Sequence, residues 1–295
     1  MKEAGVISDT TMCAWQRWID VTRSRCHLHF LLEGGCIGSH VLICRDSSRA
    51  TAHRIVNDLP ISFRPEKILE IGASVGFNSL AIAECFPQAE VHSVEPDEDA
   101  VHVAISMAAD IAANYRPLVG IGEVLSFPDG FFDLIICHTV IEHVQNVPDV
   151  VREMSRVLSK NGIVHLEAPN YVWPYEPHLG VWCIPVLGKC GVHLSAWLQG
   201  KRKNCWYINH LMFVTPFQLE RLFKENGLVW ENRAEKKLAA ALNGAAEIKK
   251  YKLASRVLVM LGKLGISRVI TTAVVRLGLY PSVMFTLRKT KIHKK

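Results

Sequence analysis

The chain has 295 residues, of which 49% are hydrophobic and 21% are charged, and its net charge at pH 7 is +6. This composition supplies enough apolar side chains for a sizeable core and excludes an intrinsically disordered chain. No apolar run reaches the roughly 18 residues that span a bilayer, and the first residues form no apolar signal segment. Together with nine cysteines that include no C-x-x-C pair, these features predict a cytoplasmic protein with reduced thiols.

Residues 1–60 predict an N-terminal helical extension, with helix-like composition at 12–21 and 48–59. From Lys67 onward, strand and helix patterns alternate, which is typical of a parallel α/β sheet. The expected strands cover 67–71, 90–94, a stretch near 118, 132–137, 162–167, 228–231 and 282–287. The expected helices cover 78–85, 98–113, 147–158 and 215–226. We therefore predict a doubly wound, mostly parallel seven-stranded sheet with helices on both faces.

The chain after residue 60 is expected to divide into a core, an insertion before the last strand, and a C-terminal part. Residues 61–235 form the core, within which the irregular, Pro- and Trp-rich segment 168–210 is an insertion after the fifth strand. Residues 236–280 form a basic helical insertion, and 281–295 hold the last strand and a basic tail.

A glycine-containing loop after the first strand carries the clearest chemical signal. It reads Glu70-Ile-Gly-Ala-Ser-Val-Gly76 and lies between a strand and a helix. Glycines there let a backbone approach a nucleotide-type ligand closely, at the carboxyl end of a parallel strand. The same letters also match G-x-S-x-G, the nucleophile elbow of a serine hydrolase, with Ser74 as nucleophile.

The next strand favours the first interpretation. It ends in Glu95, where an acid is expected to bind ribose hydroxyls, and the 66 residues before Lys67 contain no H-G-G-G-type oxyanion motif. A dinucleotide fingerprint fails as well, because Ser74 replaces its second glycine.

From Lys67 to Gly227 the sequence resembles the class I S-adenosylmethionine-dependent methyltransferases of the ubiquinone O-methyltransferase-like group. Four blocks carry the resemblance in the expected order. They are the glycine loop 70–76, Glu95-Pro-Asp97, Phe127-Pro-Asp-Gly-Phe-Phe-Asp133, and Ile141-Glu-His-Val144 with the following Glu153, Arg156-Val-Leu158 and Asn161-Gly162. The resemblance implies that S-adenosyl-L-methionine is the cofactor.

The resemblance also implies roles for residues of this chain. The loop would contact the methionine part of the cofactor, Glu70 would orient it and Glu95 would bind its ribose. The expected cofactor-binding residues are Glu70, Gly72, Ala73, Ser74, Gly76, Glu95, Pro96, Gly122, Glu123 and His138. Many relatives carry Asp-Ala after the third strand to bind adenine, whereas this chain has Ile121-Gly122, so backbone groups near Gly122 or the carboxylate of Glu123 would take that part.

Three histidines are candidate general bases, because imidazole titrates near neutral pH. His138 ends the fourth strand, His143 follows it, and His178 lies in the aromatic segment after the fifth strand and is the preferred base. That segment is expected either to form an acceptor pocket or only to close an irregular loop against the core. The candidate acceptor-binding residues are Tyr171, Trp173, Tyr175, Glu176, His178 and His210.

No metal site is expected. The acid that accompanies a Glu-His pair in ubiquinone-type relatives is replaced by Thr139, and Cys183, Cys190, His193 and Cys205 match no usual zinc spacing.

Residues 236–295 contain 14 Lys or Arg and one acid, Glu247. Lys249, Lys252, Arg256 and Lys263 fall on one side of a helical wheel. Helices over 245–277 would lie on an anionic membrane surface, cover a lipid-like acceptor, or pack on the core with a solvated basic face. Nucleic acid is a weaker partner, because the region has few aromatic residues.

The sequence thus predicts a methyltransferase that O-methylates a glycan, a lipid-linked molecule or a secondary metabolite. Two other functions stay open: a catalytically silent binding module at a membrane surface, and a serine hydrolase that uses Ser74.

Overall fold

The computed structural model describes residues 8–26, 37–111, 113–184, 187–201, 205–242 and 267–290. Contacts along the chain divide it into two compact units, which we describe separately. Unit 1 comprises residues 1–137 and 152–164, and unit 2 comprises residues 138–151 and 165–295.

Seven strands form one sheet in the order β3-β2-β1-β4-β5-β9-β8. They are β1 (Lys67–Ile71), β2 (Glu90–Glu95), β3 (Tyr115–Val119), β4 (Phe132–His138), β5 (Leu158–Pro169), β8 (Leu228–Asn232) and β9 (Ser282–Lys289). Strand β1 pairs in parallel with β2 and β4, and β2 pairs in parallel with β3, whereas β8 and β9 are antiparallel. The predicted fold class is confirmed. The chain order reverses between β1 and β4, where α/β sheets bind ligands at the strands' carboxyl ends.

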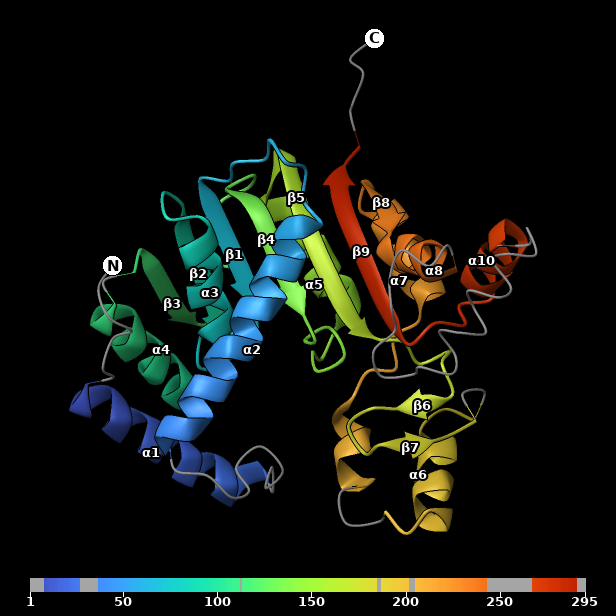
Figure 1. Ribbon diagram of the computed structural model, residues 1–295, viewed down its shortest axis with the longest axis horizontal. Coiled ribbons are helices and arrows are strands. Elements are labelled where there is room, and N and C mark those ends of the chain that lie inside the picture. Colours follow the sequence, from blue (N-terminus) through green and yellow to red (C-terminus); the bar gives the residue numbers. More distant parts are fainter. Residues whose placement is uncertain are drawn as a thin grey trace. The chain divides into compact units, whose positions relative to one another are not determined.

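Four helices of unit 1 lie beside strands β1, β2 and β3 (Figure 1). They are α1 (Asp9–Cys26), α2 (Ile37–Asn57), α3 (Phe77–Cys85) and α4 (Glu98–Asp110). Helix α2 contacts α3, and α1 contacts α4. Apolar side chains of the strands, such as Ile68, Val91 and Leu134, join Trp15 of α1 and Ile55 of α2 in one buried core. The N-terminal helices are therefore part of the core of this unit.

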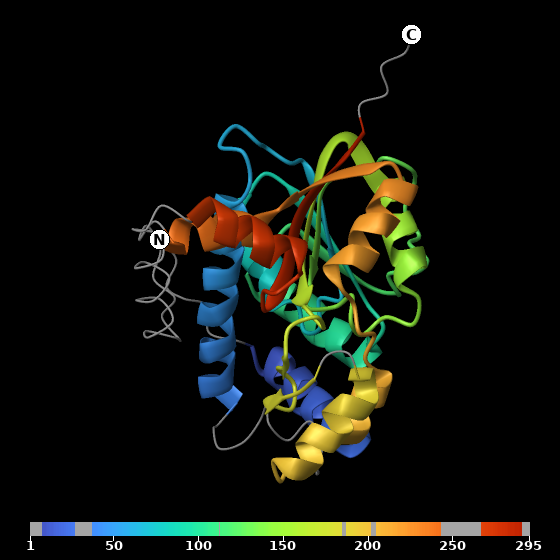
Figure 2. The ribbon, with the colours of Figure 1, turned by 90° about the vertical axis from the view of Figure 1, so that its right-hand side faces the viewer.

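Unit 2 contains the end of β5, strands β8 and β9, and the segment inserted between β5 and α7 (Pro216–Glu225). The insertion holds a hairpin of β6 (Tyr175–Glu176) and β7 (Val181–Trp182), helix α6 (Gly188–Leu198) and the 3-10 helix η3 (Cys205–His210). Helix α6 contacts both β7 and η3, and Figure 2 shows it beside the hairpin. A small core of its own, including Val181, Val192 and Ile208, stabilises the insertion.

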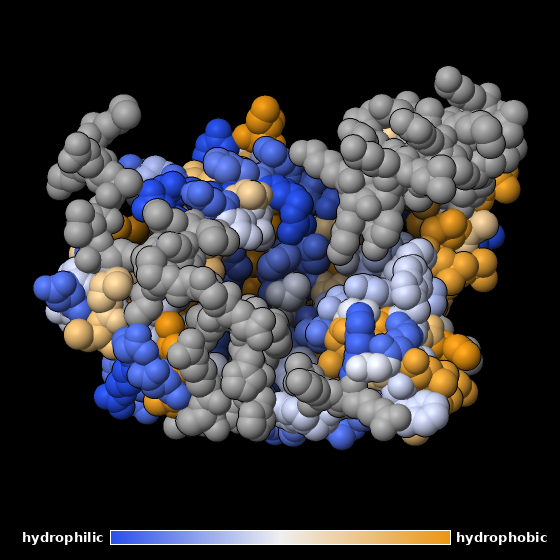
Figure 3. All heavy atoms as spheres, turned by 60° about the horizontal axis from the view of Figure 1, so that its bottom comes forward, coloured by the Kyte–Doolittle hydropathy of each residue, from blue (hydrophilic) through white to orange (hydrophobic). Residues whose placement is uncertain are grey.

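Apolar side chains also cover part of the outer surface of the insertion. Trp182, Leu194 and Trp197 are each about half exposed. In the space-filling view, hydrophobic residues drawn in orange lie at several places on the right-hand side (Figure 3).

The segment between β8 and β9 contains α8 (Arg233–Leu242) and α10 (Ser267–Arg276), which contact each other. The predicted helices over 245–277 are seen in their last part, α10, whereas the four aligned basic residues lie outside the described residues. None of the helices in the described ranges has the length and apolar character needed to cross a membrane.

Candidate active site

The loop between β1 and α3 is shaped by residues with positive φ. Gly72 has φ +71°, Ser74 +49° and Gly76 +88°. The amide of Gly72 donates to the carbonyl oxygen of Val94 at 2.8 Å, which fixes the start of the loop beside β2. The loop thus turns sharply at the carboxyl end of β1, as predicted.

Glu95, the last residue of β2, is held by backbone amides of two loops. Its Oε2 accepts a hydrogen bond from Ser74 N at 2.8 Å, and its Oε1 accepts one from Asp97 N at 3.2 Å. Pro96 lies between these two acids. Burial raises the pKa of Glu95, while the two amides act in the opposite direction. A fixed carboxylate with further lone pairs is chemically suited to accept both hydroxyls of a ribose, so the residues present fit the expected nucleoside.

Glu70 is buried at 2% exposure, and its Oε2 accepts a hydrogen bond from the Ser79 hydroxyl of α3. Burial raises its pKa to about 7. This contact joins β1 to α3, so one carboxylate oxygen already has a protein partner. Its expected contact with the cofactor stays a prediction.

The loop after β3 contains Gly122 and Glu123. It is closed by a bridge between Ile121 and Val124, and the amide of Gly120 donates to the carbonyl oxygen of Glu95 at 3.1 Å. Ile121 is 46% exposed and Val124 is 68% exposed. Such apolar side chains can contact the flat face of an adenine where an acid is missing.

A carboxylate–imidazole pair occupies the β6–β7 segment of unit 2. Glu176 is fully buried, and its Oε1 lies 2.5 Å from His178 Nδ1. The amides of His178 and Leu179 donate to the same carboxylate. A carboxylate on Nδ1 places the ring proton there and leaves Nε2 free to accept one. Glu176 is therefore a positioning residue for His178.

Three rings form a cluster around this pair. His178 lies edge-on to His143, with ring centroids 5.4 Å apart, and 5.6 Å from Tyr207. The Tyr207 hydroxyl lies 3.4 Å from His143 Nδ1. Burial, with a contribution from His178, lowers the pKa of His143 to about 4. His143 is thus neutral at pH 7.

Glu142 completes this cluster. It is fully buried, and neither carboxylate oxygen has a hydrogen-bond partner among the described residues. His143 Nε2 lies 3.8 Å from Glu142 Oε1. Burial raises the pKa of Glu142 to about 7. A buried carboxyl without a partner is costly, so this group is available to a ligand.

The other predicted acceptor residues lie in different surroundings. Tyr171 stacks on Phe213 with a centroid distance of 4.0 Å, and Tyr175 contacts Trp182 across the hairpin. The amide of Trp173 closes a turn onto the carbonyl of Asn170, and His210 contacts Trp206. Their stacking on an acceptor stays a prediction.

Sequence reasoning missed Tyr207 and the unpartnered state of Glu142. Tyr207 lies 64 residues from His143 in an irregular segment, and no local pattern indicates such a contact. The Glu142-His143 pair itself was a visible signal.

Comparison with known proteins identifies the family. A family model described as "Methyltransferase domain" matches residues 45–232. Ajmaline N-methyltransferase of Rauvolfia serpentina is 26% identical over 211 residues, which are 69% of this chain and 69% of that protein. Ubiquinone biosynthesis O-methyltransferase of Bartonella quintana is 25% identical over 178 residues, 57% of this chain and 64% of the relative.

Solved structures share the fold. The crystal structure of YcgJ from Bacillus subtilis superposes with a TM-score of 0.51 at 20% identity, covering 82% of this chain and 99% of that chain. A Haemonchus contortus phosphoethanolamine N-methyltransferase 2, solved with S-adenosyl-L-methionine, gives a TM-score of 0.52 at 15% identity over 82% of this chain and 53% of that one.

The chain belongs to the class I S-adenosylmethionine-dependent methyltransferases. S-adenosyl-L-methionine is accordingly its cofactor. The comparisons give no support to a hydrolase, and the amide of Ser74 donates a hydrogen bond to Glu95.

Proposed function

We propose that this methyltransferase transfers the methyl group to a hydroxyl oxygen of a small-molecule acceptor, with His178 as the general base. The observation that carries the proposal is the 2.5 Å contact between buried Glu176 and His178 Nδ1. It fixes the tautomer in which Nε2 is a proton acceptor, and an imidazole base is effective near neutral pH.

The cofactor supplies a methyl group that is already activated by its positive sulfur, so the protein contributes binding, orientation and proton removal. We assign ribose binding to Glu95, contact with the methionine part to the loop 72–76, and the adenine face to Ile121 and Val124. The cofactor would supply the methyl group that the acceptor oxygen takes, and His178 Nε2 would accept the proton that the acceptor hydroxyl loses.

The ring cluster of His143, His178 and Tyr207 indicates what kind of acceptor fits. Ring faces and edges bind flat or alicyclic molecules by contact area, while the imidazole and phenol groups fix a hydroxyl. Relatives named for ajmaline and for ubiquinone biosynthesis act in small-molecule metabolism. The relative named for ajmaline supports a secondary-metabolite type of acceptor.

Transfer to an amine is a second candidate, because the buried carboxylate of Glu142 has no hydrogen-bond partner among the described residues. A cationic amine would pair with that carboxylate and then lose a proton to His178. The names of two Rauvolfia relatives, which are N-methyltransferases, agree with this alternative.

Mass spectrometry of metabolite extracts incubated with the protein and deuteriomethyl-labelled cofactor tests the proposal. We expect a labelled methyl ether that the wild type forms and the His178→Gln variant forms at least about a hundredfold more slowly. Glu176→Gln should lower the rate less and change its pH dependence, since it acts through His178. A labelled amine would favour the second candidate, and equal labelling by the wild type and the His178→Gln variant would contradict the role of the base.

A further inference from the structure

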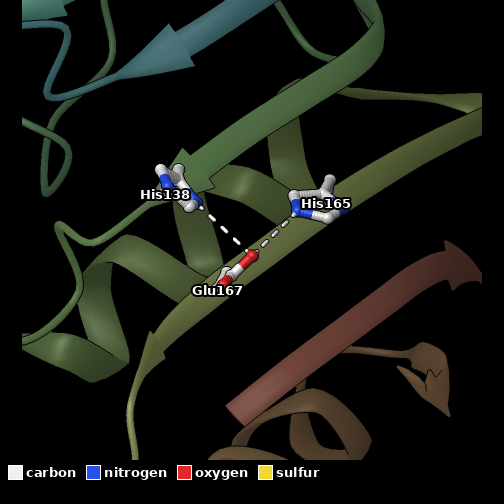
Figure 4. Close-up of side chains that lie close together, drawn as sticks. All are labelled: His138, His165 and Glu167. Carbon is white, nitrogen blue, oxygen red and sulfur yellow. Dashed lines mark ion pairs between the residues drawn. The ribbon is translucent and has the colours of Figure 1, made fainter. Parts of the chain in front are cut away.

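A second cluster of ligand-type side chains lies where β4 and β5 run side by side. His138 is the last residue of β4, and His165 and Glu167 are two positions apart on β5, so their side chains project from the same face. The amide of Thr139 donates to the carbonyl of Glu167 at 2.7 Å, which keeps the two strand ends together. Figure 4 shows the two imidazoles pointing toward the carboxylate from either side.

The distances between the donor atoms match those of a metal site. Glu167 Oε2 lies 3.5 Å from His138 Nδ1 and 3.8 Å from His165 Nε2. All three ligand atoms lie within 4.8 Å of one another. Ligands at about 2.1 Å from a tetrahedral zinc ion are about 3.4 Å apart. An ion at the centre of this triangle would therefore need only small movements of the side chains.

His165 supplies independent evidence that something else binds here. The side chain has 0% exposure, and neither of its ring nitrogens has a hydrogen-bond partner among the described residues. Buried polar groups are almost always bonded, and an unbonded one calls for a ligand. His165 Nε2 faces Glu167, so the unpartnered atom points into the cluster.

We propose that His138, His165 and Glu167 bind a first-row divalent transition-metal ion, such as Zn²⁺. Two imidazole nitrogens and one carboxylate oxygen suit zinc, cobalt or iron, whereas Mg²⁺ and Ca²⁺ prefer oxygen ligands. Three protein ligands leave a fourth position for water or another small ligand. Sequence patterns did not predict this site, because its residues come from two strands and share no motif spacing.

Cobalt titration of the chelator-treated full-length protein tests this site by visible absorption. Tetrahedral Co²⁺ gives d–d bands, and binding through nitrogen and oxygen lacks the thiolate charge-transfer band that cysteines would add. We expect one equivalent of Co²⁺, displaced by Zn²⁺, and a rise in the melting temperature of the wild type with zinc. His165→Gln and Glu167→Gln should each weaken binding at least about tenfold and reduce the thermal shift.

Two variants serve as controls. His92→Gln removes another buried strand histidine, which pairs with Glu90 at 2.8 Å, and should bind cobalt as the wild type does. His143→Gln removes a ligand atom from the only other described group of this kind, Glu142, His143 and His178. The proposal is overturned if the folded wild type takes up no cobalt, or if His143→Gln abolishes uptake while His165→Gln and Glu167→Gln leave it intact. Circular dichroism verifies that each variant is folded, and Glu167→Gln decides alone if His165→Gln is not.

Discussion

Three buried glutamates of this protein differ in what compensates their burial. The carboxylate of Glu70 accepts the Ser79 hydroxyl, and that of Glu176 accepts two backbone amides and contacts His178. Glu142 has no such partner in the described part of the chain. Burial therefore dominates its protonation and raises the pKa to about 7, although its own backbone amide and the nearby His178 act in the opposite direction.

Replacing Glu142 by Gln should change how stability depends on pH. The pKa of Glu142 is about 7 in the folded protein and near 4.5 for an ordinary glutamate. Between these values the folded state binds the extra proton, so its stability falls as pH rises, by up to about 3 kcal/mol above pH 7. Gln resembles the protonated acid and does not titrate. Thermal unfolding should therefore show Glu142→Gln near wild type at pH 5 and clearly more stable at pH 8.

The matched control is Glu225→Gln, which changes an exposed carboxylate on α7. Its stability relative to wild type should be the same at both pH values. A difference in stability between Glu142→Gln and wild type that stays constant from pH 5 to pH 8 would contradict this prediction. It would show that Glu142 is ionised throughout this range.

At the scale of elements, Gly76 explains how α3 starts so close to its neighbours. Its φ is +88°, and a Cβ atom there would lie 2.8 Å from the Tyr115 hydroxyl oxygen and 3.0 Å from Ala104 Cβ. The missing side chain lets the loop approach β3 and α4. Gly76 thus allows close packing of the loop against β3 and α4, in addition to the cofactor contact that the resemblance implies.

Gly76→Ala should destabilise the protein by more than about 2 kcal/mol, because it adds both backbone strain and a clash with Tyr115. Denaturant unfolding measures this loss. Gly120→Ala is the control, since a Cβ atom there would lie 3.5 Å from Val94, an ordinary contact, and φ is not positive. Equal stability of the two variants would refute the steric account.

Most helices and strands could be predicted from the sequence, because hydrophobic periodicity and helix-capping residues indicated the same boundaries. Helix α4 begins after Asp97, whose side chain accepts amides of its first turn, and α7 begins after the Thr215 cap. Helix α6 was not predicted. It contains Gly188 and Gly191, and its N-cap Leu187 makes no side-chain hydrogen bond, so neither composition nor capping indicates a helix there.

The candidate site likewise has a part that the sequence predicts and a part that it does not. Glu95 and the glycine loop lie at neighbouring strand ends, where the strand–helix alternation alone places them near each other. Tyr207 reaches His143 only through the packing of η3 in unit 2, and His138 meets His165 only through the pairing of β4 with β5. Such contacts depend on tertiary structure and leave no mark in local spacing.

At the scale of the whole molecule, the cluster of basic residues in 236–295 has no role in the methyl transfer proposed above. We predict reversible binding to anionic vesicles through 245–277. Each charge near such a surface contributes about 1 kcal/mol at most, so binding should need apolar insertion as well and should weaken steeply with salt.

Co-sedimentation with vesicles checks this prediction. The wild type should sediment with phosphatidylserine-containing vesicles at low salt and stay in solution with neutral ones. A variant with Lys249, Lys252, Arg256 and Lys263 changed to Gln should sediment less. Equal sedimentation of both proteins would contradict membrane binding through these four residues. It would favour the alternative in which the basic insertion packs on the core.

We propose that unit 1 binds the methyl-donor cofactor through Glu95 and the loop 72–76. Calorimetric titration of S-adenosylhomocysteine, the demethylated product, into the full-length protein tests it most directly. We predict one site in the wild type and in Glu98→Ala, which removes a neighbouring exposed carboxylate. Affinity should fall about a hundredfold in Glu95→Ala, because hydrogen bonds to a charged group contribute about 1.5–3 kcal/mol each. Absence of binding by the folded wild type, or equal affinity of Glu95→Ala and Glu98→Ala, would contradict the account.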